Sequence, residues 1–147
     1  LEAAGHPVNG VVPHDGSGLD PDNRLTCGLL ASVLDDRYLG ASLVESLPVA
    51  GDRGTMKNRF AGTAGEGRVR AKTGTLRGVT SLAGVVDTPG GRRLAFALIS
   101  NGELPYEIRE IHEDLVLSML SYPAGPGVDV LSPLPVVDSP IPQTSGG

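Results

Sequence analysis

The stretch Arg68-Val69-Arg70-Ala71-Lys72-Thr73-Gly74-Thr75-Leu76 decides the fold, because it reads as one β-strand that carries a cation, two hydroxyls and a gap. Side chains of a strand alternate between its two faces. Thr73 and Thr75 therefore share one face, where their hydroxyls can hold a carboxylate. On the other face, Gly74 leaves room for a ligand or a backbone to come close. Lys72 adds a mobile positive charge beside that gap.

Two further strands are predicted after this one. Residues 79–87 alternate in hydropathy, and the turn sequence Thr88-Pro89-Gly90-Gly91 joins them to residues 92–100. The strand at 92–100 is apolar on both faces, which predicts that other elements cover it on both sides.

Helices are predicted on either side of these strands. Residues 25–39 form a helix capped by Thr26, residues 41–47 form a second helix that stops at Pro48, and residues 56–60 form a helical turn. Residues 105–122 form the last helix, which has an apolar face and a charged face. Its buried stripe is predicted to be Ile108, Ile111, Leu115 and Met119, and its solvated face Glu107, Arg109, Glu110, Glu113 and Asp114. The fold class is α+β, an antiparallel sheet covered by helices.

Composition limits the classes of function. The chain has 147 residues, 39% of them apolar, and a net charge of −5, so a nucleic-acid partner has no electrostatic support. A single Cys27 excludes an internal disulfide, and no apolar run is long enough to span a membrane. Residues 1–122 are predicted to form one domain portion, and the Pro-, Gly- and Ser-rich residues 123–147 a disordered tail.

The triplet Lys72-Thr73-Gly74 matches a known signature of acyl-transfer enzymes, in which it follows a Ser-x-x-Lys and a Ser-x-Asn motif. Neither companion occurs here, because neither Lys57 nor Lys72 has a serine three residues before it and no asparagine has a serine two residues before it. We therefore expect the nucleophile to lie outside these residues and the chain to be a C-terminal piece of a longer protein.

Several spaced motifs strengthen the match. The sequence resembles the C-terminal third of class C low-molecular-mass penicillin-binding proteins, which are D-alanyl-D-alanine carboxypeptidases and endopeptidases. The matching motifs are Asp15-Gly16-Ser17-Gly18-Leu19 with Asn23, Leu47-Pro48-Val49-Ala50-Gly51, Gly54-Thr55-Met56 with Arg59, Lys72-Thr73-Gly74-Thr75-Leu76, and Leu94 through Gly102. The resemblance covers residues 12–122. Asp20 departs from it, since the family commonly has serine there.

The resemblance implies a transpeptidase-like fold and a role for each matched residue. Lys72 would orient the proton relay, and the Thr75 N–H would form half of the oxyanion hole. The hydroxyls of Thr73 and Thr75 would bind the terminal D-alanine carboxylate, and Gly74 would permit its close approach. The substrate pocket would be edged by Leu76, Ser17 and Leu19.

The same resemblance implies the partners and the location. The substrates would be peptidoglycan stem peptides, β-lactam antibiotics would be covalent inhibitors of the complete enzyme, and the protein would be exported to the periplasm or cell wall. No cofactor is implied. We also expect no metal site, because His6, His14 and His112 lack the spacing of metal ligands.

Alternatives remain open at this point. A serine β-lactamase uses the same strand, and a catalytically inactive cell-wall-binding module would retain it without the nucleophile. The Asp15–Gly18 segment can equally be a plain Asx turn that precedes a helix, with no substrate role.

Overall fold

The computed structural model describes residues 1–102 and 105–125. Residues 126–147, most of the predicted tail, lie outside the described residues. The helices are α1 (Cys27–Leu34), α2 (Leu39–Ser46) and α3 (Pro105–Ser118), and the strands are β1 (Val69–Leu76), β2 (Val79–Asp87) and β3 (Arg93–Asn101). Short 3-10 turns are η1 (Glu2–Ala4), η2 (Gly54–Met56) and η3 (Met119–Ser121).

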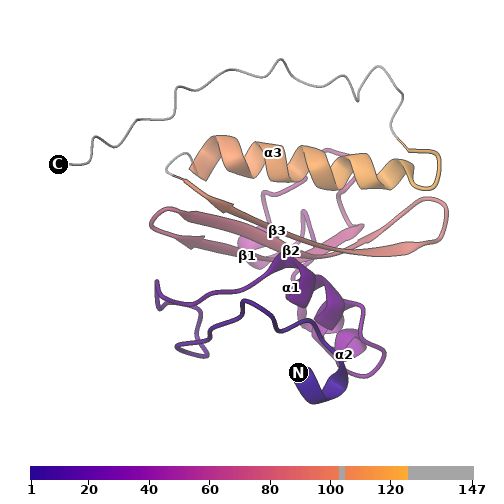
Figure 1. Ribbon diagram of the computed structural model, residues 1–147. Helices are drawn as coiled ribbons and strands as arrows, with labels where there is room; N and C mark the ends of the chain where they lie inside the picture. Colours follow the sequence, from indigo (N-terminus) through magenta and orange to yellow (C-terminus); the bar gives the residue numbers. More distant parts are fainter. Residues whose placement is uncertain (103–104, 126–147) are drawn as a thin grey trace, which may run out of the picture.

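The three strands form one antiparallel sheet in the order β1-β2-β3. Figure 1 shows α3 lying along one face of this sheet, while α1, α2 and the N-terminal segment lie on the other face. The predicted α+β class, an antiparallel sheet with helices on both faces, is confirmed. The third strand has the apolar character on both faces that such a position requires.

The core consists of two clusters, one on each face of the sheet. Toward α3, Val69 and Ala71 of β1 pack with Leu82 and Val86 of β2 and with Val116 of α3. Toward α1 and α2, the buried residues are Leu34, Val44, Leu47 and Val85. The alternation of each strand thus divides its apolar side chains between the two clusters.

β1 is an edge strand that is only partly covered. Residues 48–50 pair with its first half, since the Ala50 N–H donates to the Val69 carbonyl at 2.9 Å and the Ala71 N–H donates to the Pro48 carbonyl at 3.2 Å. Backbone groups of alternate residues point to the same side of a strand. The N–H and C=O groups of Thr73 and Thr75 therefore point toward the edge that residues 48–50 leave open.

The prediction of one helix over residues 25–39 is wrong. The Thr26 cap is confirmed, because its Oγ1 accepts from the Leu29 N–H at 3.1 Å. However, α1 ends at Leu34, and the second helix, predicted over residues 41–47, is observed as α2 and begins earlier, at Leu39. The Asp36 carboxylate accepts from the N–H groups of Tyr38 and Leu39, each at 2.8 Å, and starts the new helix there.

The predicted buried stripe of the last helix is also partly wrong. Ile111 and Leu115 are 52% and 49% exposed, whereas His112 and Val116 are buried. The stripe that faces the sheet is displaced by one residue, because the buried His112 finds a polar partner in Ser100 of β3. Sequence hydropathy alone does not count a histidine as a core residue.

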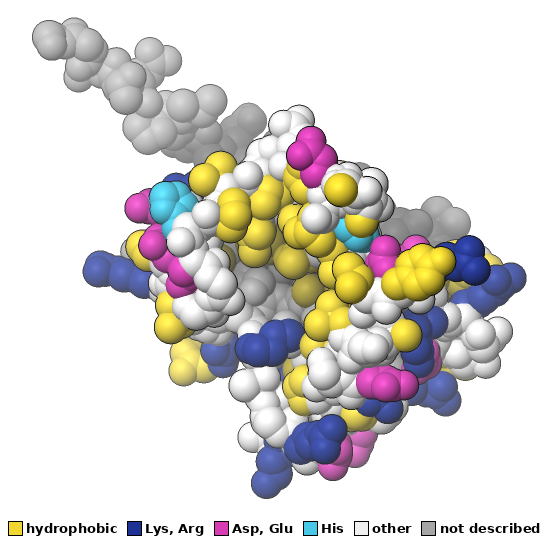
Figure 2. Space-filling view, turned by 90° about the horizontal axis from the view of Figure 1, so that it is seen from below, with side chains coloured by type: hydrophobic (Ala, Val, Ile, Leu, Met, Phe, Trp, Pro, Cys, Tyr) yellow, Lys and Arg dark blue, Asp and Glu magenta, His cyan; other side chains and the backbone are white. Residues whose placement is uncertain are grey.

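No helix in the described part of the chain combines the length and the apolar character needed to cross a membrane. Large apolar side chains nevertheless remain exposed, among them Leu39 and Leu43 of α2. Figure 2 shows hydrophobic side chains gathered around a hollow on the side of the molecule that carries α1 and α2.

Candidate functional site

The Lys72-Thr73-Gly74 strand lines a cavity of about 460 Å³ at the open edge of β1. Lys72, Thr73, Gly74 and Thr75 all contribute to its wall. The remaining lining residues are Thr55, Arg59, Thr80, Ser81 and Arg109. The structure thus brings together four of the predicted site residues and adds five others from η2, the loop after it, β2 and α3.

The side chains of β1 at the site alternate between the two faces of the strand. Thr75 lies on the α3 face, since its Oγ1 is 3.4 Å from Nη2 of Arg109 in α3. By alternation Thr73 shares that face, and Lys72 and Gly74 have the opposite one. The Lys72 Nζ donates to the Thr73 carbonyl oxygen at 2.7 Å, and so lies over the open edge of the strand.

Arg59 is fixed at the site by a charge pair with Glu113 of α3. Its Nε donates to the Glu113 carboxylate, whose second oxygen accepts from the Phe60 N–H at 3.3 Å. Phe60 is buried in the core and has a left-handed backbone with φ 60°, which is uncommon for a bulky residue. This strained turn directs Arg59 toward the cavity while the phenyl ring packs inside.

Gly74 faces Ser81 across the β1–β2 pair. A Cβ placed on Gly74 would lie 2.3 Å from the Ser81 Oγ, so the serine hydroxyl occupies the space that the glycine leaves. Leu76 is the last residue of β1 and does not line the cavity.

Ser17 and Leu19 do not line this cavity either. Both belong to a loop organised around the Asp15 carboxylate, which accepts from the Ser17 hydroxyl at 2.5 Å, from Asn23 Nδ2 at 2.7 Å, and from the Gly18 and Leu19 N–H groups. The Ser17 and Asn23 side chains, followed by these backbone donors, hold the Asp15 pKa far below its usual range. Leu19 is 69% exposed at the surface of this loop. The contacts with Ser17, Gly18 and Leu19 are local, as the Asx-turn interpretation expects.

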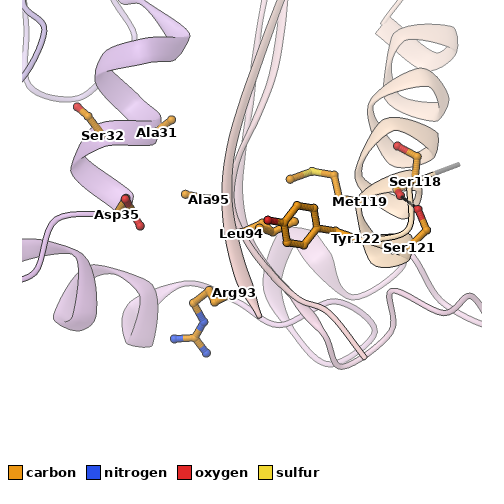
Figure 3. Close-up of a pocket in the computed structure, with 11 residues that line it drawn as sticks. Ala31, Ser32, Asp35, Arg93, Leu94, Ala95, Ser118, Met119, Ser121 and Tyr122 are labelled. Carbon is orange, nitrogen blue, oxygen red and sulfur yellow. Dashed lines mark hydrogen bonds between the residues drawn. The ribbon is translucent and has the colours of Figure 1, made fainter. Parts of the chain in front are cut away.

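A second, larger cavity of about 730 Å³ follows the outer edge of β3. Figure 3 shows Ser32 of α1 and Asp35, which follows that helix, on one side of the sheet, with Met119 and Tyr122 on the other and Leu94 and Ala95 between. No residue of the Lys72–Leu76 strand lines it. The smaller cavity, where the hydroxyls and cations converge, is therefore the candidate site.

His112 lies under α3, where its Nε2 is 2.9 Å from the Ser100 Oγ of β3. Its Nδ1 is buried without a hydrogen-bond partner among the described residues. Burial, and secondarily the positive charge of Arg59, lowers the pKa of this imidazole. His112 is thus held neutral behind the site.

This neutral histidine predicts a pH dependence of stability. The unfolded chain binds a proton at His112 near pH 6.5, while the folded chain resists it, so the free energy of unfolding should fall as pH drops below about 6.5, by at most about 1.4 kcal/mol per pH unit. His112→Gln should remove this contribution, and His14→Gln should retain it. Urea denaturation at pH 7.5 and pH 5.5 measures the difference. Equal pH slopes in His112→Gln and wild type would contradict the prediction.

Sequence reasoning missed Arg109 and Glu113, which were predicted to lie on the solvated face of the last helix. Both instead face β1 and the loop after η2. Arg109 and Glu113 are four residues apart, and so are His112 and Val116, which are buried. Residues four apart lie on the same side of a helix, so the first pair lies beside the buried pair. Counting His112 as a buried residue would therefore have placed Arg109 and Glu113 next to the face that packs on the sheet.

Residues 1–120 match the family model described as the D-Ala-D-Ala carboxypeptidase 3 (S13) family. Carboxypeptidase DacB of Mycolicibacterium smegmatis is 43% identical over 118 residues, covering 71% of this chain and 25% of that protein. D-alanyl-D-alanine carboxypeptidase of Actinomadura sp. is 41% identical over 110 residues, covering 69% and 20%. The chain therefore spans about a quarter or less of the length of these relatives.

Solved structures show the same fold. The crystal structure of penicillin binding protein 4 (dacB) from Haemophilus influenzae superposes with a TM-score of 0.71 at 26% identity, covering 83% of this chain and 30% of that one. The same protein complexed with a β-lactam gives a TM-score of 0.67 at 29% identity, covering 79% and 31%. With a family model matched over residues 1–120, the chain belongs to the D-Ala-D-Ala carboxypeptidase 3 (S13) family.

Proposed function

We propose that this chain supplies the carboxylate-binding strand of a serine-type D-Ala-D-Ala carboxypeptidase or endopeptidase that acts on peptidoglycan stem peptides. The observation that carries the proposal is the cavity at the open edge of β1. Hydroxyls and cations line this cavity, and among residues 1–102 and 105–125 no carboxylate does. An anionic peptide terminus fits such a lining, because charge-assisted hydrogen bonds to a carboxylate are among the strongest in proteins.

Each residue of the strand has a role in this proposal. The Thr73 and Thr75 hydroxyls bind the terminal carboxylate of the substrate, and the Thr75 N–H at the open edge forms half of the oxyanion hole. Lys72 supplies positive charge to the proton relay. Gly74 permits close approach of the substrate once the Ser81 hydroxyl beside it rotates away. Ser17, Leu19 and Leu76 are proposed to edge the pocket for the substrate side chain in the complete enzyme.

The nucleophile comes from residues outside this chain. In the complete enzyme, meaning this chain together with segments that carry the Ser-x-x-Lys and Ser-x-Asn motifs, the serine oxygen forms an ester bond to the penultimate D-alanine carbonyl. The amide bond breaks, and the proton of the serine passes to the amine of the departing D-alanine. Water then cleaves the ester and restores the serine. No cofactor takes part.

The location and the inhibitors follow from the same assignment. An enzyme that trims peptidoglycan acts outside the cytoplasmic membrane, so the complete enzyme is exported. The H. influenzae relative was solved in complex with a β-lactam. We extend this to the present protein and propose that β-lactam antibiotics acylate its serine.

The test compares the complete enzyme with the 147-residue chain. We expect the complete enzyme to be labelled covalently by a fluorescent penicillin and to release D-alanine from a peptide ending in D-Ala-D-Ala. Replacement of the serine of Ser-x-x-Lys by alanine should abolish both. The 147-residue chain alone should acquire no hydroxylamine-sensitive label, because it lacks the nucleophile.

Three outcomes would count against the proposal. Rapid penicillin hydrolysis without D-alanine release would favour a β-lactamase-like enzyme. Neither labelling nor D-alanine release by the complete enzyme would favour an inactive cell-wall-binding module. A stable label on the isolated chain would show that its nucleophile lies within these residues.

A further inference from the structure

Arg109 reaches the candidate site from a different element than the signature strand. It lies in α3 as a half-buried residue, its Cζ is 5.4 Å from the centre of the Tyr106 ring, and its Nη2 is 3.4 Å from the Thr75 Oγ1. Contact with an aromatic face restricts the motion of a guanidinium and stabilises its charge. Arg109 is therefore held beside the hydroxyl that is proposed to bind substrate.

The charges around the cavity are unbalanced. Three cations line it, Lys72, Arg59 and Arg109. Arg59 is paired with Glu113, whereas no salt bridge is formed by Lys72 or Arg109 within residues 1–102 and 105–125. In the described part of the chain, the cavity thus holds two positive charges without carboxylate partners, which favours an anionic ligand.

The two unpaired cations differ in the face of β1 that they serve. Lys72 is attached on the face opposite to Thr75, and its Nζ contacts the Thr73 carbonyl. Arg109 approaches from α3, on the face where the Thr75 hydroxyl lies. An arginine also offers two parallel N–H donors that match a carboxylate, which a lysine does not.

We propose that Arg109 is a specificity-determining residue, which binds the terminal carboxylate of the substrate together with Thr75 and makes the site prefer peptides with a free C-terminus. The inference rests on the proposed function, and adds to it that Arg109 and Lys72 have different roles. Arg109 selects for the carboxylate, while Lys72 remains available to the reacting groups. A peptide whose C-terminus is extended or amidated would lose the contact with Arg109.

The experiment measures the complete enzyme on two substrates, a peptide ending in D-Ala-D-Ala and its C-terminal amide. Loss of a charged hydrogen bond should lower kcat/KM for the acid in Arg109→Gln by roughly tenfold to a hundredfold, with the amide changed less than about threefold. Arg109→Lys, which keeps the charge but not the paired donors, should be intermediate. Arg92→Gln is the matched control, since it removes the same charge at the opposite end of the sheet.

The acid-to-amide ratio separates selection from a structural role. If Arg109→Gln lowers both activities equally, or leaves the ratio unchanged, the inference is wrong even though the complete enzyme is active. If the complete enzyme cleaves neither peptide, the proposed function fails. The role of Arg109 is then tested by measuring whether a carboxylate ligand binds to the chain. In that case, shifts of the Thr75 amide resonance on titration of the 147-residue chain with N-acetyl-D-alanine should vanish in Arg109→Gln. Equal shifts in both chains, or none in wild type, would overturn it.

Discussion

Gly84→Ala is expected to lower the free energy of unfolding of this chain by about 3–5 kcal/mol. Gly84 lies in the central strand β2, opposite Ala71 of β1. A Cβ at this position would lie 2.0 Å from the Arg70 carbonyl oxygen and 2.6 Å from the Ala71 Cα. Both are backbone atoms of β1, so no side-chain rotation relieves the contact and the two strands must separate.

Gly74→Ala is the matched control, because it adds the same methyl group to the neighbouring strand. Its Cβ would meet the Ser81 hydroxyl, which can rotate away, and we expect a loss below about 1 kcal/mol. Urea denaturation followed by circular dichroism measures both variants. Similar midpoints for Gly84→Ala and Gly74→Ala would show that β1 and β2 are less closely packed than the structure indicates.

Much of the sheet could be predicted from local sequence. The Thr88–Gly91 turn and the alternation of residues 79–87 fix the β2–β3 hairpin, and the observed strands differ from the predicted bounds by at most one residue at either end. A hairpin depends on contacts between residues close in sequence, and such contacts leave a clear pattern.

The helix bounds depended on contacts that the pattern does not show. The apolar pattern extended the first of the two predicted helices to residue 39, but Gly40 of α2 approaches the end of α1 so closely that a Cβ would lie 2.5 Å from the Leu34 carbonyl oxygen. The Asp36 side chain then caps α2. Both effects arise from tertiary packing, which overrides helix propensity.

The candidate site was predictable only along its strand. Thr73 and Thr75 were assigned to one face from alternation. The Arg109 contact places Thr75 on the α3 face, and Thr73 pairs with Leu82, a member of the core cluster on that face. The arginine itself comes from a helix 34 residues further along the chain. The Arg59–Glu113 pair likewise joins residues 54 positions apart. Pairs so distant in sequence leave no periodic signal in a single chain.

Thr73→Val in the complete enzyme is expected to lower kcat/KM for a D-Ala-D-Ala peptide by roughly tenfold to a hundredfold. Valine has nearly the volume and branching of threonine, so the change removes a hydroxyl without opening a cavity. The Thr73 side chain is half-buried in the wall of the cavity. There a charged hydrogen bond to the substrate carboxylate is worth about 1.5–3 kcal/mol.

Thr73→Ser is the control for this prediction, because it keeps the hydroxyl and removes only a methyl group. We expect its kcat/KM to stay within about threefold of wild type, which corresponds to less than about 0.7 kcal/mol. Thermal unfolding of all three proteins should give equal midpoints within a few degrees, so that lost activity cannot be attributed to lost fold. If Thr73→Val hydrolyses the peptide as fast as Thr73→Ser, the Thr73 hydroxyl does not bind the carboxylate. The substrate carboxylate would then be bound by Thr75 and Arg109 alone, which already lie within hydrogen-bonding distance of each other.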